Sequence, residues 1–259
     1  MLGRPKGLYV TLSCPQTLTI ELPTRRALSH ELAEALRQML PEWVKTVLVT
    51  GLGNRSVTPD ALGPRTVERV LVTRHMAGCL PEDVENRMGR VCAAAPGVLG
   101  VTGMETAEVL RGMVEHVQPD AMIAVDALAA RSSARICSTI QVADTGITPG
   151  SGVGNHRQAL DRKNLGIPVI AVGVPMVVYA STIAGDALGA LGGEDEALDA
   201  ETLAEAISRV VSEKLGEMIV TPREVDALVE RMSGILAEGI NLALHPGLSS
   251  TEIAQLMAE

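Results

Sequence analysis

Two aspartates, Asp60 and Asp126, each follow an apolar segment that the sequence predicts to be a buried strand. A glycine turn separates the first segment, residues 45–50, from Asp60, and Asp126 closes the later segment, residues 121–125. Ligands of open parallel sheets bind beyond the carboxyl ends of the strands, so we expect both carboxylates at one edge of such a sheet. Two carboxylates at short range hold one proton between them, because like charges cannot both ionise there. The pair would therefore supply an acid and a base for activating water.

Each aspartate also has a structural interpretation that needs no chemistry. Asp60 directly follows Thr58-Pro59, a predicted helix start, where the helix dipole stabilises a negative charge. A carboxylate that closes an apolar run, as Asp126 does, is costly to bury unless it is paired, solvated or used in chemistry. For Asp126 the structural interpretation is therefore a paired or solvated carboxylate. Both interpretations stay open at this point, and the functional one is stronger for Asp126 than for Asp60.

Other motifs point to chemistry less directly. Asp144-Thr145-Gly146 has the sequence of the pepsin and retroviral protease signature, but that signature belongs to β-rich lobes, so a turn is the favoured interpretation. The glycine-rich segment 150–154 could hold an anion on its backbone N–H groups, yet it lacks a Walker lysine-serine pair and GxGxxG spacing after a strand. Ser151, which lies within this segment, is not part of a G-x-S-x-G elbow.

The histidines and cysteines do not form a metal-binding pattern. The five histidines are scattered without HxH or HxxxH spacing, and His75 and His156 are the nearest to acceptable ligands. The four cysteines show no CxxC spacing, and no apolar leader precedes them, which favours reduced thiols in a cytoplasmic protein. We therefore predict no metal and no cofactor.

The composition argues against several classes of function. A formal net charge of −9 argues against a nucleic-acid or anionic membrane surface. With 46% hydrophobic and 20% charged residues, the chain has the composition of a packed globular protein, and it contains no continuous apolar run long enough to span a membrane. It has no Phe, one Trp and two Tyr, so Ala, Val, Leu, Ile and Met must fill the core and base-stacking platforms are not expected.

Strands and helices alternate along the sequence, which favours an α/β fold. Besides the two strands above, strands are predicted at residues 136–143 and 169–172. Helices with an apolar face are predicted at residues 28–40, 59–71, 103–118 and 222–236, the last two after capping boxes that begin at Thr102 and Thr221. This order implies a mostly parallel sheet covered by helices on both faces. Nothing resembles an interdomain linker, so residues 1–259 are predicted to form a single domain.

Long ordered segments of the chain match a known family. They are residues 51–64 (GLGNRSVTPDALGP), 67–75 (VERVLVTRH), 95–106 (APGVLGVTGMET), 124–131 (AVDALAAR), 144–155 (DTGITPGSGVGN), 167–175 (IPVIAVGVP), 220–227 (VTPREVDA) and 239–245 (GINLALH). In these segments the sequence resembles the germination protease family, the spore endopeptidases that degrade small acid-soluble spore proteins. The match covers most of residues 45–245.

The resemblance implies a fold, a site and a biological setting. The fold would be a three-layer αβα domain similar to that of the hydrogenase-maturation endopeptidases. The family's two essential aspartates fall on Asp60, within VTPDALGP, and on Asp126, within AVDALAAR. The resemblance further implies an atypical aspartic endopeptidase that needs no metal and initiates the degradation of small acid-soluble spore proteins in the spore core during germination. It also implies a homo-oligomer, such as a tetramer.

Departures from the family pattern motivate two alternatives. Family members usually carry a longer N-terminal segment with a propeptide, whereas the match here begins near residues 7–9. Tyr179 stands where the family typically has an acidic residue after Val177-Val178. A non-catalytic or regulatory relative is therefore one alternative. The other is a metal-dependent peptidase like the hydrogenase-maturation enzymes, whose corresponding carboxylates bind a metal.

Overall fold

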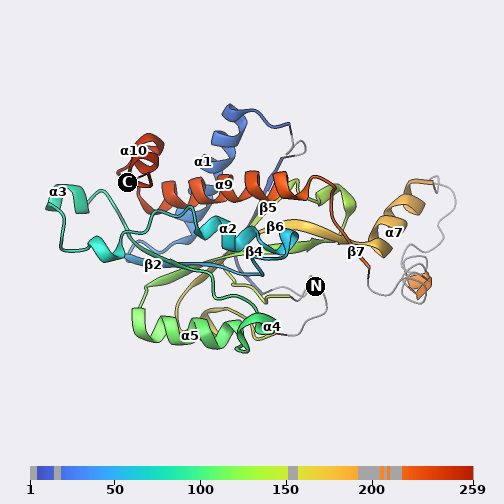
Figure 1. The fold of residues 1–259 in the computed structure, drawn as a ribbon, viewed down its shortest axis with the longest axis horizontal. Coiled ribbons are helices and arrows are strands. Elements are labelled where there is room, and N and C mark those ends of the chain that lie inside the picture. Colours follow the sequence, from blue (N-terminus) through green and yellow to red (C-terminus); the bar gives the residue numbers. More distant parts are fainter. Residues whose placement is uncertain are drawn as a thin grey trace.

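A mixed β-sheet lies between two layers of helices, which gives the molecule a three-layer αβα architecture (Figure 1). The computed structural model describes residues 5–14, 19–150, 157–191, 205–206, 209–210 and 218–258. Of the glycine-rich segment 150–154, which was considered for anion binding, only Gly150 is among the described residues, so Ser151 lies outside them, as does His156. The α/β fold class expected from the sequence is confirmed.

The sheet has the strand order β1-β5-β6-β4-β2-β3, with β7 pairing with β6 at its far end. The strands are β1 (Tyr9–Ser13), β2 (Thr46–Gly51), β3 (Arg90–Ala94), β4 (Ala121–Ala130), β5 (Thr139–Ala143), β6 (Val169–Tyr179) and β7 (Ile219–Val220). β3, β2, β4 and β6 pair in parallel, while β5 and β7 run antiparallel to β6, and β1 pairs antiparallel with β5. The parallel part of the sheet thus consists of four strands, which run from β6 in its interior to β3 at one edge.

Two strands are longer than the apolar pattern predicted. β4 does not end at Asp126 but continues to Ala130, because its partner β6 also continues, to Tyr179. The register of this pair shifts between Leu128 and Ala129, which marks an irregularity just beyond the aspartate. β5 is shorter than the predicted strand 136–143, since a 3₁₀ turn and a left-handed residue, Cys137 (φ +51°), precede it.

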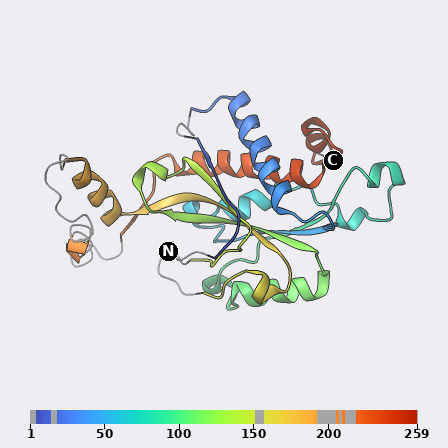
Figure 2. The same ribbon diagram turned by 180° about the vertical axis from the view of Figure 1, so that it is seen from behind.

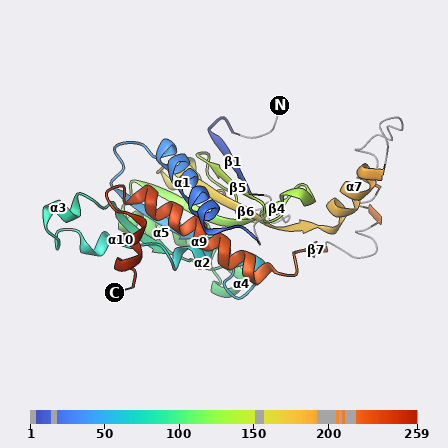
Figure 3. The ribbon, with the colours of Figure 1, turned by 90° about the horizontal axis from the view of Figure 1, so that it is seen from above.

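Helices cover both faces of the sheet (Figures 1 and 2). The helices and 3₁₀ turns are α1 (Leu22–Met39), η1 (Thr58–Asp60), α2 (Leu62–Val67), η2 (Arg74–Met76), α3 (Glu82–Glu85), α4 (Leu99–Thr102), α5 (Thr106–Val117), η3 (Ser133–Arg135), α6 (Arg162–Leu165), α7 (Ala180–Leu191), α9 (Val225–Leu244) and α10 (Ser250–Leu256). α1 and α9 pack against each other over one face, as the view from above shows, and α2 lies beneath α9 (Figure 3). α5 covers the opposite face.

The core is filled without phenylalanine. Leu, Ile and Met provide the largest fully buried side chains, such as Leu36, Ile123 and Met232. A large cluster joins α1, α2 and α9 to the sheet, and a smaller one joins α5 to the other face. Within the described residues, no helix has the length and apolar character needed to cross a membrane.

The predicted starts of three helices differ from the observed ones. The segment after Pro59 forms the 3₁₀ turn η1 and then the short helix α2, which ends at Val67 and does not reach residue 71. Neither predicted capping box forms: the Thr102 hydroxyl accepts a bond from the N–H of Met104, and the Thr221 hydroxyl donates to the carbonyl of Met176. These local and tertiary bonds take the hydroxyls away from the helix starts.

Candidate active site

The turn after β2 positions Asp60. Gly53 in this turn has a positive φ of 111°, a conformation that favours glycine, and its Cα faces the Asp60 carboxyl group so closely that a Cβ atom would lie 2.9 Å from Oδ1. The chain therefore folds back on itself, and the N–H of Asn54 donates a 2.6 Å hydrogen bond to Asp60 Oδ2. The 3₁₀ turn η1 begins with Thr58-Pro59 and ends on Asp60. The predicted helix start thus exists in a shorter form.

Asp126 lies in β4, one residue beyond the residue that pairs with the end of β2. The last residue of β2, Gly51, pairs with Val125, and the next residue of β4, Asp126, pairs with Gly173 of β6. The side chain is only 6% exposed, and its Oδ1 accepts a 2.9 Å hydrogen bond from the N–H of Ala127. Although β4 does not stop at Asp126, the carboxylate still occupies the carboxyl-end edge formed by β2, as a parallel sheet requires.

Both aspartates line one cavity of about 530 Å³. Its walls come from the turn after β2, from the C-terminal halves of β4 and β6, from β5, and from residues 147–150 after β5. Three arginines also line it: Arg131, Arg135 and Arg157. The two aspartates that the sequence analysis selected are therefore brought together, although they lie 66 positions apart in the sequence.

The cavity raises the pKa of both carboxyl groups. Burial is the largest influence on Asp60, and it outweighs the opposing effects of the Asn54 hydrogen bond and the positive charge of Arg157. Burial also dominates at Asp126, and the nearby charge of Asp60 adds to it, so that the pKa of Asp126 rises to about 7. The Ala127 N–H and Arg157 act in the opposite direction. At a pH just below 7, the arrangement supports one ionised and one protonated carboxyl group.

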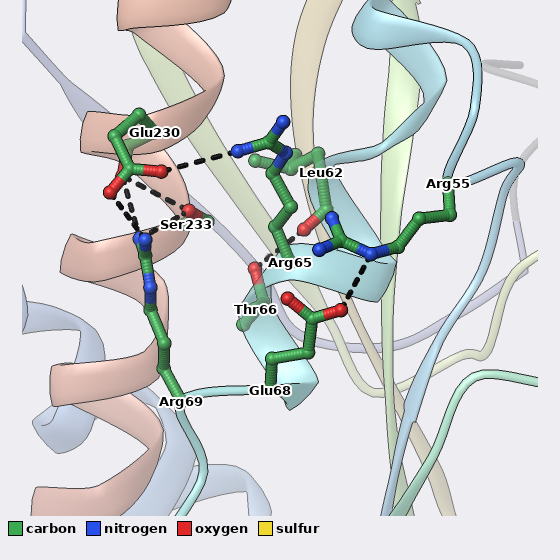
Figure 4. A network of polar contacts seen from close by, with 8 residues as sticks. All are labelled: Arg55, Leu62, Arg65, Thr66, Glu68, Arg69, Glu230 and Ser233. Atoms are coloured by element: carbon green, nitrogen blue, oxygen red, sulfur yellow. Dashed lines mark hydrogen bonds and ion pairs between the residues drawn. The ribbon is translucent and has the colours of Figure 1, made fainter.

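A network of polar contacts fixes the helix that follows Asp60 against α9 (Figure 4). Arg69 contacts the Glu230 carboxylate, and its Nη1 donates to the Glu230 carbonyl oxygen at 2.9 Å and to Ser233 Oγ at 2.8 Å. Arg65 reaches the same carboxylate at 3.3 Å. On the other side of α2, Arg55 pairs with Glu68 at 2.6 Å. The short helix α2 is thereby held at both sides, and Asp60 precedes it by two residues.

The sequence can now be placed among known proteins. A family model described as "Germination protease" matches residues 1–194 and 188–256. The chain belongs to the germination protease family. Germination proteases are peptidases, and the two segments that carry Asp60 and Asp126 both lie within the first matched region.

Individual germination proteases are similar to the chain over nearly its whole length. The germination protease of Clostridium acetobutylicum is 43% identical over 268 residues, covering 96% of this chain and 82% of that protein. The relative from Caldanaerobacter subterraneus subsp. tengcongensis is 42% identical over 274 residues, covering 99% and 84%. Among solved structures, the [NiFe] hydrogenase maturation protease HycI from Thermococcus kodakarensis matches with a TM-score of 0.41 and 17% identity, covering 80% of this chain and 98% of that chain.

The donors around the cavity do not complete a metal site within the described part of the chain. No group of three or more His, Cys, Asp and Glu side chains lies close enough together there to hold a metal ion. His75 lies in η2, which does not line the cavity, and His245 is fully buried, with its Nε2 3.1 Å from the Leu71 carbonyl oxygen.

The Asp144-Thr145-Gly146 segment is a turn, as the sequence analysis favoured. The Asp144 carboxylate accepts the N–H of Leu8 at 2.9 Å, and the Thr145 hydroxyl donates to the Tyr9 hydroxyl at 3.1 Å. These bonds tie the start of β1 to the end of β5. The resemblance to an aspartic protease signature is therefore a coincidence of sequence, and Asp144 does not line the cavity.

Sequence reasoning did not select the three cavity arginines. Arg157 comes just after the glycine-rich segment that was considered for anion binding. That segment was the one feature of the sequence here that pointed to a charged site. Arg131 and Arg135 follow β4, and both are exposed. Their presence in the cavity depends on contacts between β4, β5 and the following loop, which a single sequence does not reveal.

Proposed function

We propose that the chain is an endopeptidase that initiates the degradation of small acid-soluble spore proteins during germination, with Asp60 and Asp126 as its catalytic pair. One observation carries this proposal: both carboxyl groups line one cavity, and the charge of Asp60 raises the pKa of Asp126. Membership of a peptidase family supports a hydrolytic reaction. We further propose that residues 1–259 act as one domain, in the cytoplasm of the spore core and as a homo-oligomer, without binding nucleic acid.

The unequal environments of the carboxyl groups assign their roles. Asp60 is only partly buried and accepts the Asn54 N–H bond, so it ionises first and serves as the general base. Asp126 is more deeply buried and has the higher pKa, so it keeps the proton and serves as the general acid. A water molecule gives one proton to Asp60 as its oxygen attacks the peptide carbonyl carbon. Asp126 then donates its proton to the leaving nitrogen as the C–N bond breaks.

Substitution of the two aspartates by asparagine tests this function. The parent chain, Asp60→Asn and Asp126→Asn are each incubated with a purified small acid-soluble spore protein, and the fragments are identified by mass spectrometry. We expect specific internal cleavage by the parent and a loss of at least about 10²-fold in kcat for each variant. The matched control is Asp226→Asn, because Asp226 is exposed on the first turn of α9. Asp161 is not used because its side chain caps α6. Cleavage that survives both active-site substitutions would contradict the proposed pair.

The same assay separates the two alternatives. A non-catalytic relative would yield no fragments at any pH, whereas a metal-dependent peptidase would lose its activity in a chelator and regain it when metal is returned. Tyr179, which motivates the first alternative, ends β6 opposite Ile219 and is not among the residues that line the cavity. We therefore expect that Tyr179→Glu changes kcat little.

A further inference from the structure

One arginine in the cavity is positioned to act on both aspartates. Arg157 lines the cavity together with Asp60 and Asp126, and its positive charge influences both carboxyl groups. Arg131 and Arg135 line the same cavity but do not contribute to either shift. Among the described residues, the Arg157 side chain has no ion pair and no hydrogen bond, so its N–H donors are available to a ligand.

The backbone next to Arg157 is well anchored. Three residues further on, Leu160 is fully buried and forms a two-bond bridge with Ile147, with N–O distances of 2.9 and 2.7 Å. The next residue, Asp161, caps α6 by accepting the N–H of Asn164, whose side chain donates to the Ala159 carbonyl oxygen at 2.9 Å. Since these bonds fix the chain directly after Arg157, its guanidinium group is presented to the cavity from a stable support.

Peptide hydrolysis needs a donor that the aspartates do not supply. When water attacks, the carbonyl oxygen gains negative charge, and hydrogen-bond donors aimed at it stabilise the transition state. The two backbone N–H groups beside the carboxyl groups, those of Asn54 and Ala127, already donate to Asp60 and Asp126. Gln141 also lines the cavity, but its amide is neutral. A guanidinium group provides both a full charge and several N–H donors.

We propose that Arg157 is a third catalytic residue, which binds the scissile carbonyl oxygen and stabilises the negative charge that develops on it. This role rests on the proposed peptidase function. As the C–O bond to water forms, the π electrons of the carbonyl move onto the oxygen that Arg157 holds, while Asp60 takes the water proton. When these electrons return, the C–N bond breaks and Asp126 protonates the nitrogen. Arg157 keeps all of its protons throughout.

The test compares Arg157→Ala and Arg157→Lys with the control Arg162→Ala. Arg162 is an exposed arginine on α6, five positions further along, and it does not line the cavity. We expect kcat to fall about 100-fold or more in Arg157→Ala, with KM within about threefold of the parent. Because the charge of Arg157 lowers the pKa of both aspartates, both limbs of the pH profile should also move to higher pH. Arg157→Lys should keep the limbs in place and retain more activity than the alanine variant.

Two results would overturn the proposal for Arg157. One is a kcat for Arg157→Ala within about threefold of the parent. The other is a lower kcat with both pH limbs at their parental positions, which a merely structural role would give. Melting temperatures are measured for every variant, and Arg157→Gln replaces the alanine variant if the latter is unfolded at the assay temperature. Cleavage that persists in Asp60→Asn and Asp126→Asn would contradict the proposed peptidase pair itself, so the two failures are distinguishable.

Discussion

The backbone of Gly63 packs directly against the carbonyl group of Val125. A Cβ atom at Gly63 would lie 2.6 Å from the Val125 carbonyl oxygen and would also overlap the backbone of Leu52. Leu52 in turn donates its N–H to the same Val125 oxygen at 2.8 Å. Gly63 follows Asp60 by three residues and Val125 directly precedes Asp126, so this close approach sets the position of one carboxylate relative to the other.

We expect Gly63→Ala to separate the two aspartates. The added methyl group has no space, so α2 or β4 must shift, at a cost of about 1–3 kcal/mol in the free energy of unfolding. Displacement of catalytic groups by about 1 Å is sufficient to lower kcat at least about tenfold. Urea denaturation and steady-state cleavage measure the two effects.

Gly112→Ala provides the matched control for this substitution. Gly112 is an exposed residue in the middle of α5, and nothing lies within 4 Å of a Cβ atom there. The change should raise stability by about 0.5–1 kcal/mol without affecting cleavage, because alanine has the higher helix propensity. Equal activity of Gly63→Ala and the parent would show that the close approach does not position the site.

The pH dependence of cleavage should be bell-shaped. In the proposed mechanism Asp60 is ionised and Asp126 is protonated, so kcat/KM should fall on the alkaline side as the pH rises through about 7, where Asp126 loses its proton. On the acid side it should fall as Asp60 becomes protonated, at a pH above the usual range of an aspartate because burial raises the pKa of Asp60. A profile of kcat/KM from pH 3 to pH 9 checks both limbs. Constant activity across the alkaline limb would contradict the assignment of Asp126 as the acid.

Asp126 should reduce the stability of the folded protein at neutral pH. Its pKa is about 7 in the folded state and 3.8 when unperturbed, so the folded protein binds an additional proton between these values. The stabilisation from this proton is fully present below pH 3.8 and is lost as the pH rises through 7. Asp126→Asn removes the ionisation, and we expect it to raise the free energy of unfolding at pH 8 by at most about 4 kcal/mol relative to the parent.

Urea denaturation at pH 4 and pH 8 measures this effect. The gain from Asp126→Asn should nearly vanish at pH 4. The control Asp226→Asn, at an exposed position on α9, measures what a surface Asp→Asn change does at the same two pH values. An equal gain at both pH values would indicate that packing, and not ionisation, is responsible. The expected result is a variant that is more stable than the parent at pH 8 and at least about 10²-fold less active.

The aspartate pair was predictable because each carboxylate interrupts or follows an apolar strand at the carboxyl edge of the sheet, a local pattern with a general physical cause. The length of β4 was not, since the strand continues past Asp126 only because β6 pairs with it there. The antiparallel direction of β5 and the presence of Arg157 in the cavity also depend on contacts between distant segments, such as the bridge between Ile147 and Leu160.

The Arg69–Glu230 contact should stabilise the helix that follows the turn carrying Asp60. Arg69 donates to the carboxylate and the carbonyl oxygen of Glu230 and to the hydroxyl of Ser233, so its removal takes away three hydrogen bonds to α9. Arg65 and Ser233 still donate to Glu230, which limits the loss. We expect Arg69→Met to lower the free energy of unfolding by about 1–2 kcal/mol. Glu230→Gln should cost less than about 1 kcal/mol, because the pair is partly exposed and the backbone contact remains.

A double-mutant cycle with both substitutions isolates the ionic part of this contact. Urea denaturation of the parent, the two single variants and the double variant should give a coupling energy of about 0.5–1 kcal/mol that decreases in 1 M salt. The pair of Arg37 and Glu34, which lies three positions apart on the exposed side of α1, is the matched control and should give a coupling below about 0.5 kcal/mol. A coupling for Arg69 and Glu230 no larger than this control would mean that their ion pair does not hold α2 to α9, which leaves the apolar contacts and the remaining bonds of Arg65 and Arg69.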